Sequence, residues 1–213
     1  MGRRALVLIG SPKGPDASAS GRLSRILTAR LEEGGWSIDR LSLYDADEGG
    51  LLSSISESDI VILASPLYVD SLPAPVIKWM ELIAEERERR PIDEGSPRFV
   101  ALLNCGFVEP KHNAVAERIC RRFASHARFE WYGAISLGCA GMPRRRIARA
   151  LEIAADALKK GFPVPPQVKR LTRRPVVPRL VYVIVGNIAW RRTARKKHSL
   201  GKWDLLAQPY KSE

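Results

Sequence analysis

Short apolar runs alternate with segments of helical periodicity along the first 160 residues of the chain. The runs are rich in valine, isoleucine, leucine and phenylalanine, and they predict strands at residues 5–9, 36–43, 59–64, 99–103 and 129–137. Apolar residues at helical spacing predict helices at residues 21–33, 74–86, 113–125 and 144–160. Residues 44–58 fit neither pattern, and we predict a loop or a short irregular helix there.

This order of elements predicts an α/β fold. Strands that are apolar at nearly every position need cover on both faces, which is typical of parallel sheets flanked by helices. Strands that alternate with helices indicate a doubly wound arrangement with crossover connections. We therefore predict a domain at residues 1–160, built on a five-stranded parallel sheet.

The chain changes character after Gly161. Residues 163–178 contain five prolines and little periodicity, and the apolar run 180–190 that follows lies between arginine-rich segments. We predict that residues 161–213 form a basic C-terminal extension rather than a second domain with its own core.

Charge divides the chain at a similar point. The 213-residue sequence has a formal net charge of +12, and residues 144–213 hold 18 Lys and Arg against 4 Asp and Glu. The remaining residues, 1–143, hold 17 against 19, so the body is close to neutral and the last third is strongly basic. Such a segment is either a solvated surface or a surface for an anionic partner.

Four interpretations of the extension remain open. Residues 176–190 form the last helix of the sheet and bury its apolar surface on the core, or the apolar run 180–190 lies on an anionic membrane with Trp190 at the interface. It also suits an arm that joins two copies of the chain. Nucleic acid is the least favoured partner, because the basic runs lack a known recognition motif.

Other features narrow the class of protein. No apolar run approaches the roughly 20 residues of a transmembrane helix, and the first apolar run is too short for a signal peptide. The cysteines are widely spaced and form no metal or disulfide pattern: Cys105, Cys120 and Cys139. The histidines are isolated, and we expect them at the surface: His112, His126 and His198. A reducing cytoplasm is the expected location.

A loop rich in hydroxyl groups follows the first predicted strand. Ligands of open α/β sheets bind beyond the carboxyl ends of the strands, and a helix N-terminus attracts phosphate. Ser11, Ser18 and Ser20 are therefore candidate phosphate ligands, with Lys13 as a nearby positive charge. The spacing matches neither GxGxxG nor GxxxxGK[ST], which disfavours a dinucleotide site or a P-loop. Simple capping of the helix by the serines is an equally good interpretation.

Two further loops follow the third and fourth predicted strands. SPLYVDSLPAPVIKWM (65–80) carries Leu67, Tyr68 and Val69 on a turn, and NCGFVEPKH (104–112) carries Gly106 and Phe107. Apolar and aromatic tips of this kind suit a flat ring. The three loops together favour a ligand with a phosphate at one end and an aromatic system at the other.

The stretches GSPKGPDASASGRL, SPLYVDSLPAPVIKWM and LNCGFVEP resemble the NAD(P)H-dependent FMN reductase family of flavodoxin-like proteins over residues 5–160. The resemblance implies an FMN cofactor, with NADH or NADPH as co-substrate and often a homo-oligomer such as a dimer. It implies that the serine loop binds the phosphate of FMN. The other two loops would enclose the isoalloxazine ring through Pro66, Leu67, Tyr68, Val69, Asp70, Asn104, Cys105, Gly106 and Phe107. The long basic extension departs from the family.

The expected function is therefore an FMN-dependent NAD(P)H oxidoreductase that reduces a small acceptor such as a quinone or a flavin. Because the flavin carries the chemistry, we expect no catalytic side chain and no metal. Two alternatives remain. A flavodoxin-like electron carrier is disfavoured by the charge of +12, because such carriers are acidic. A flavin-free module would bind an anionic membrane or nucleic acid through its basic tail.

Overall fold

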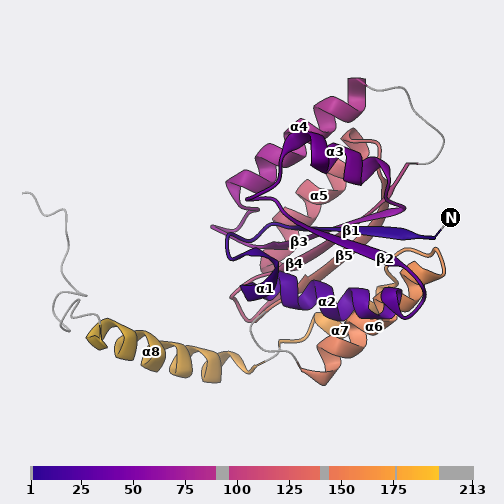
Figure 1. Ribbon diagram of the computed structural model, residues 1–213. Coiled ribbons are helices and arrows are strands. Elements are labelled where there is room, and N and C mark those ends of the chain that lie inside the picture. Colours follow the sequence, from indigo (N-terminus) through magenta and orange to yellow (C-terminus); the bar gives the residue numbers. More distant parts are fainter. Residues whose placement is uncertain (1, 90–95, 140–143, 176, 197–213) are drawn as a thin grey trace, which may run out of the picture. The chain divides into compact units, whose positions relative to one another are not determined.

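The computed structural model describes residues 2–89, 96–139, 144–175 and 177–196 (Figure 1). Within these residues five strands form one parallel sheet in the order β2-β1-β3-β4-β5. The strands are β1 (Arg4–Ile9), β2 (Ser37–Ser42), β3 (Ile60–Pro66), β4 (Arg98–Asn104) and β5 (Glu130–Leu137). This is the flavodoxin-like order, and it confirms the predicted fold class.

Helices cover both faces of the sheet. The first group is α1 (Gly14–Ala17), α2 (Ala19–Glu32), α6 (Arg145–Lys159) and α7 (Pro166–Thr172). The second group is α3 (Glu48–Ser56), α4 (Ala74–Arg89) and α5 (Ala114–His126), with the short 3₁₀ helix η1 (Pro110–Asn113) leading into α5. In Figure 1 the first group lies on one side of the sheet and the second on the other.

The segment 44–58, predicted as a loop or a short irregular helix, contains the short helix α3. Asp47 begins it, because its side chain accepts a hydrogen bond of 2.8 Å from the backbone N–H of Gly50. Leu51, Leu52 and Ile55 are buried on its inner face. The helix therefore forms because capping and burial outweigh a weak local pattern.

An aromatic cluster fills the core between β4, β5 and α5. The ring of Phe99 lies 5.2 Å from that of Phe123, 5.5 Å from that of Phe129 and 6.1 Å from that of Trp131, centroid to centroid. Phe99 is almost completely buried. These contacts fix the helix α5 against the sheet and so hold the loop between β4 and α5 in place.

The first compact unit extends beyond the predicted boundary at residue 160. It comprises Met1–Val176, and the second unit comprises Val177–Glu213. Val168 on α7 is fully buried, and the backbone N–H of Val164 donates to the carbonyl of Tyr132 over 2.7 Å. Residues 161–175 thus complete the first unit.

The described part of the second unit is residues 177–196, which contain the helix α8 (Arg179–Lys196). Among the described helices, none has both the length and the hydropathy required to cross a bilayer.

Candidate functional site

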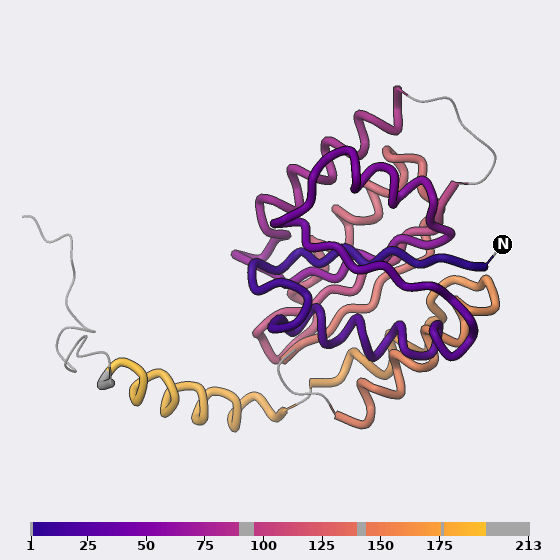
Figure 2. The backbone as a smooth tube through the Cα atoms, in the orientation of Figure 1, coloured from indigo at the N-terminus to yellow at the C-terminus, as the bar shows by residue number. Residues whose placement is uncertain are grey.

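The three candidate loops follow β1, β3 and β4, which are neighbours in the sheet. Parallel strands end at the same edge, so the loops start side by side (Figure 2). Backbone hydrogen bonds join them: Gly10 donates to Ala64 over 2.9 Å, and Leu67 donates to Asn104 over 2.8 Å. The sequence prediction that these loops converge is therefore confirmed.

Ser18 is the N-cap of α2. Its hydroxyl oxygen accepts a hydrogen bond of 2.9 Å from the backbone N–H of Gly21. The capping interpretation of this serine is thus what the structure shows, although an accepting hydroxyl can still donate its own proton to an anion. Ser11 is buried, and its hydroxyl oxygen lies 3.4 Å from the backbone nitrogen of Lys13, whose side chain is exposed.

Ser20 connects two of the candidate loops. Its hydroxyl donates to the side-chain oxygen of Asn104 over 2.8 Å, and both residues are buried. The bond ties the start of α2 to the end of β4. Because a hydroxyl has a single proton to donate, Ser20 acts here as a link rather than as an anion donor.

The loop after β1 packs closely on the first turn of α2. It contains the one-turn helix α1 where the sequence analysis expected a loop without helix. A Cβ atom at Gly21 would overlap the backbone carbonyl of Pro15. The absence of a side chain at this position therefore determines where the loop lies.

The loop after β3 turns sharply at two residues with left-handed backbone conformation. Val69 has φ +50° and Asp70 has φ +57°. The N–H of Tyr68 donates to the carbonyl of Ser71 over 2.8 Å, and the reverse bond measures 3.1 Å. Positive φ at both central residues defines a type I′ turn, in which glycine and asparagine are preferred. A β-branched residue such as Val69 is strained there, and strain of this kind is concentrated at functional sites.

We expect the substitution Val69→Asn to raise the free energy of unfolding by about 1 kcal/mol, because asparagine tolerates the left-handed conformation better than valine. No burial is lost, since the Val69 side chain is 100% exposed. Urea unfolding measures the effect. Val115→Asn on α5 is the control: it changes the same atoms at an exposed position with helical backbone and should not stabilise the protein. A lower free energy of unfolding in Val69→Asn than in the wild type would contradict the strain assigned to Val69.

Aromatic side chains surround this turn. Tyr68 and Phe107 are 44% and 49% exposed, respectively, although each is large and apolar. Phe107 stacks on His112 with ring centroids 4.4 Å apart. The ring nitrogens of His112 lie 3.8 Å from a carboxylate oxygen of Asp70 and 3.9 Å from one of Glu109. The prediction that His112 is isolated was wrong, because the loops after β3 and β4 converge around it.

Tyr44 is a further candidate site residue, which the sequence analysis did not select. It follows β2 at the same edge of the sheet and is partly exposed. Partial burial raises its pKa, and the nearby Tyr68 raises it further. The sequence did contain a signal for Tyr44, because this residue directly follows the predicted strand at residues 36–43. The same criterion selected the other three loops.

The cysteines of this edge are buried and protonated at neutral pH. Burial is the largest cause that raises the pKa of Cys105 and of Cys139, and it raises that of Cys120 in α5 to about 12. The backbone N–H of Cys139 donates to the carbonyl of Phe107 over 2.7 Å. Cys105 and Cys139 thus contribute shape rather than a thiolate nucleophile.

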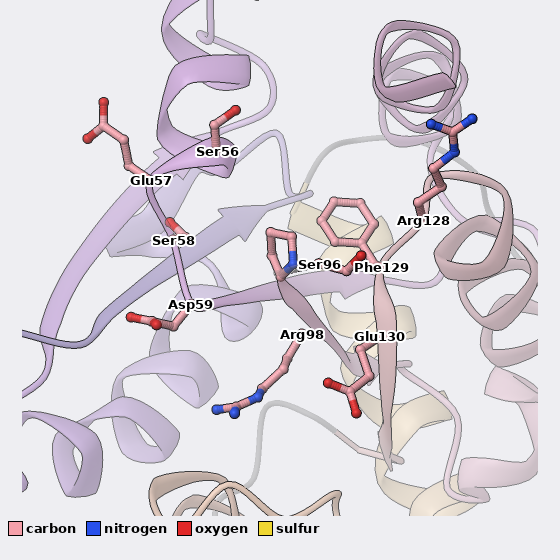
Figure 3. A pocket seen from close by; sticks show the side chains of 10 residues that line it. Ser56, Glu57, Ser58, Asp59, Ser96, Arg98, Arg128, Phe129 and Glu130 are labelled. Carbon is pink, nitrogen blue, oxygen red and sulfur yellow. The ribbon is translucent and has the colours of Figure 1, made fainter. Parts of the chain in front are cut away.

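A cavity of about 780 Å³ lies at the opposite, amino edge of the sheet (Figure 3). Two of its charged groups contact protein: Asp59 accepts a hydrogen bond of 2.7 Å from the backbone N–H of Arg4, and the guanidinium of Arg98 lies 5.1 Å from the Tyr132 ring centroid. Figure 3 shows Arg98 and Glu130 pointing in a similar direction and Arg128 pointing away from them. This mixed-charge hollow has no convergent set of ligand groups, so we do not assign the site there.

Among the described residues, no group of three or more His, Cys, Asp or Glu side chains could hold a metal ion.

Comparisons with known proteins agree with the fold. Residues 3–104 match a family model described as the flavodoxin-like fold. No curated protein sequence gives a significant match. Together with the solved structures below, the match shows that the chain has a flavodoxin-like fold.

Three similar structures cover nearly the whole length of their own chains. The apo form of an NADH:FMN oxidoreductase has a TM-score of 0.60 and 15% identity, over 84% of this chain and 98% of that one. A flavodoxin from Streptococcus pneumoniae has a TM-score of 0.58 and 17% identity, over 75% of this chain and 99% of the flavodoxin. An FMN-dependent NADH-azoreductase from Bacillus anthracis, in complex with FMN, has a TM-score of 0.56 and 13% identity. The match covers 74% of this chain and 100% of the azoreductase.

A longer protein contains the same fold as one of its parts. The rubredoxin oxygen:oxidoreductase from Desulfovibrio gigas matches with a TM-score of 0.57 and 12% identity over 79% of this chain, which spans 36% of that protein. At these identities the likeness concerns the fold.

Proposed function

We propose that the protein is an FMN-dependent NAD(P)H oxidoreductase that passes electrons to a small acceptor such as a quinone or a flavin. The observation that carries the proposal is the pairing of two unlike surfaces at one edge of the sheet. A hydroxyl-lined helix N-terminus follows β1, and a strained turn with exposed aromatic side chains follows β3. FMN has a phosphate at one end and a planar ring at the other.

The phosphate end fits the loop after β1. The helix α2 has no acidic residue in its first turn, so the partial positive charge of its N-terminus is not neutralised there. Ser11 and Ser18 are buried in the loop, and Lys13 supplies an exposed positive charge. We assign these groups to the phosphate and assign Ser20 to the support of Asn104.

The ring end fits the loops after β3 and β4. Pro66 and Leu67 lead into the turn, and Tyr68 and Phe107 present large exposed aromatic surfaces. Aromatic faces of this type stabilise a stacked ring by roughly 0.5–1.5 kcal/mol each beyond the buried area. Asp70 offers a polar side chain at the periphery, and Asn104, Cys105 and Gly106 lie at the start of the loop after β4.

Bound FMN would supply the redox chemistry by accepting a hydride from reduced nicotinamide. The side chains then need to bind the ring, orient it and limit access of water, and no acid–base group is required. His112, on the loop after β4, lies near Asp70 of the loop after β3 at the ring end.

We expect Tyr68→Ala to weaken FMN binding about 2- to 13-fold, because one stacking face is lost. The dissociation constant is measured by quenching of flavin fluorescence. Tyr182→Ala on α8 is the control, because it removes a partly exposed tyrosine that lies outside the three loops. Equal FMN affinity in Tyr68→Ala and the wild type would remove Tyr68 from the site.

The proposed activity is tested with FMN-loaded protein under anaerobic conditions. Addition of NADH or NADPH should bleach the visible flavin absorption, and a quinone should restore it. Retained flavin that neither nucleotide reduces would contradict the reductase and leave a one-electron carrier as the function.

A further inference from the structure

The helix α8 carries an unusual exposed apolar surface. Residues 180–190 read LVYVIVGNIAW, and their large side chains are exposed, with Trp190 at 79%. Eleven residues make about three helical turns, so the apolar side chains lie on all sides of the helix. A helix that is apolar on all sides is typical of a protein interior or a membrane.

Arginines lie at both ends of this apolar segment. Arg179 precedes it, and Arg191 and Arg192 follow it, all with exposed side chains. The sequence around the helix has one sign of charge: residues 157–203 contain 13 Lys and Arg and no Asp or Glu. The partner that this charge complements is therefore anionic.

The length of the apolar segment excludes a transmembrane arrangement. At 1.5 Å per residue the segment is about 16 Å long, roughly half the thickness of a hydrocarbon core. It suits a shallow position in one leaflet. Arginines at its ends can then extend to the phosphates, and Trp190 lies where aromatic side chains are preferred, at the interface.

We propose that α8 docks the protein on an anionic phospholipid bilayer. A second copy of the chain is a poorer occupant of this apolar surface. Two α8 helices paired in either orientation would bring arginine ends together, and the sequence offers no nearby acidic residue to offset them. The proposal depends on α8 alone and is independent of flavin binding.

The test is flotation of the full chain with vesicles of phosphatidylcholine, with and without phosphatidylserine. We expect binding only to the vesicles that contain phosphatidylserine, and we expect salt to weaken it. Each arginine near an anionic surface strengthens binding about fivefold, so Arg191→Gln with Arg192→Gln should weaken it about 25-fold. Ile184→Asp with Ile188→Asp should abolish it, because charge is then placed in the apolar segment.

A matched control separates docking by α8 from a general attraction of the basic protein to the anionic membrane. Arg121→Gln with Arg122→Gln removes the same charge from exposed positions on α5 and should leave binding within about threefold of the wild type. Equal loss in both double variants would overturn the proposal. So would absence of binding by the wild type, or a dimer in solution that the Ile184→Asp, Ile188→Asp variant dissociates, because another surface would then cover α8.

Discussion

Replacement of Gly21 by alanine is expected to abolish FMN retention and to lower the stability of the protein by about 1–3 kcal/mol. The added Cβ would overlap the backbone carbonyl of Pro15. Backbone cannot give way as a flexible side chain can, so the loop that carries Ser11 and Ser18 must move away from α2. The phosphate ligands would then no longer converge. Gel filtration with FMN and thermal unfolding measure the two effects.

Gly49→Ala provides the matched control for Gly21→Ala. Gly49 also lies in the first turn of a helix, α3, but the nearest atom to an added Cβ is an Asp47 side-chain oxygen 3.7 Å away. Alanine should leave FMN retention unchanged and raise stability by up to about 1 kcal/mol. Full FMN retention by Gly21→Ala would contradict the assignment of this loop to the phosphate.

Phe99→Ala is expected to have the largest effect on folding, a loss of about 3–5 kcal/mol. The ring is almost completely buried and contacts three other aromatic rings, so its removal leaves a cavity. Urea unfolding monitored by circular dichroism gives the change in the free energy of unfolding.

Phe107→Ala removes the same atoms from an exposed position in the candidate site. With half of its surface exposed, it should cost less than about 1 kcal/mol of stability. It should nevertheless weaken FMN binding, because Phe107 is an expected contact of the ring. Similar stability losses for Phe99→Ala and Phe107→Ala would contradict the separation between core and site.

The sheet was predictable because its strands are strongly apolar. The runs at residues 5–9, 59–64 and 99–103 lie within β1, β3 and β4 or overlap them closely, since burial on both faces leaves a clear signal. The helix Glu48–Ser56 was less certain, because capping by Asp47 and tertiary burial determine it. The one-turn helix Gly14–Ala17 depends on close packing against Gly21, which local sequence does not reveal.

The site was predictable as a set of loops but not as a set of contacts. Strand order places the loops at one edge, so Tyr68 and Phe107 could be selected from sequence. The bond from Ser20 to Asn104 spans 84 positions in sequence, and the stacking of Phe107 on His112 depends on the loop conformation. Such side-chain pairings arise from tertiary packing, and only the structure reveals them.

The most direct test of the flavin site is the visible absorption spectrum of the purified protein, repeated after incubation with FMN and desalting. We predict a flavin spectrum that remains with the protein after desalting. A protein that stays colourless in both states would contradict the flavin site, while the flavodoxin-like fold would stand.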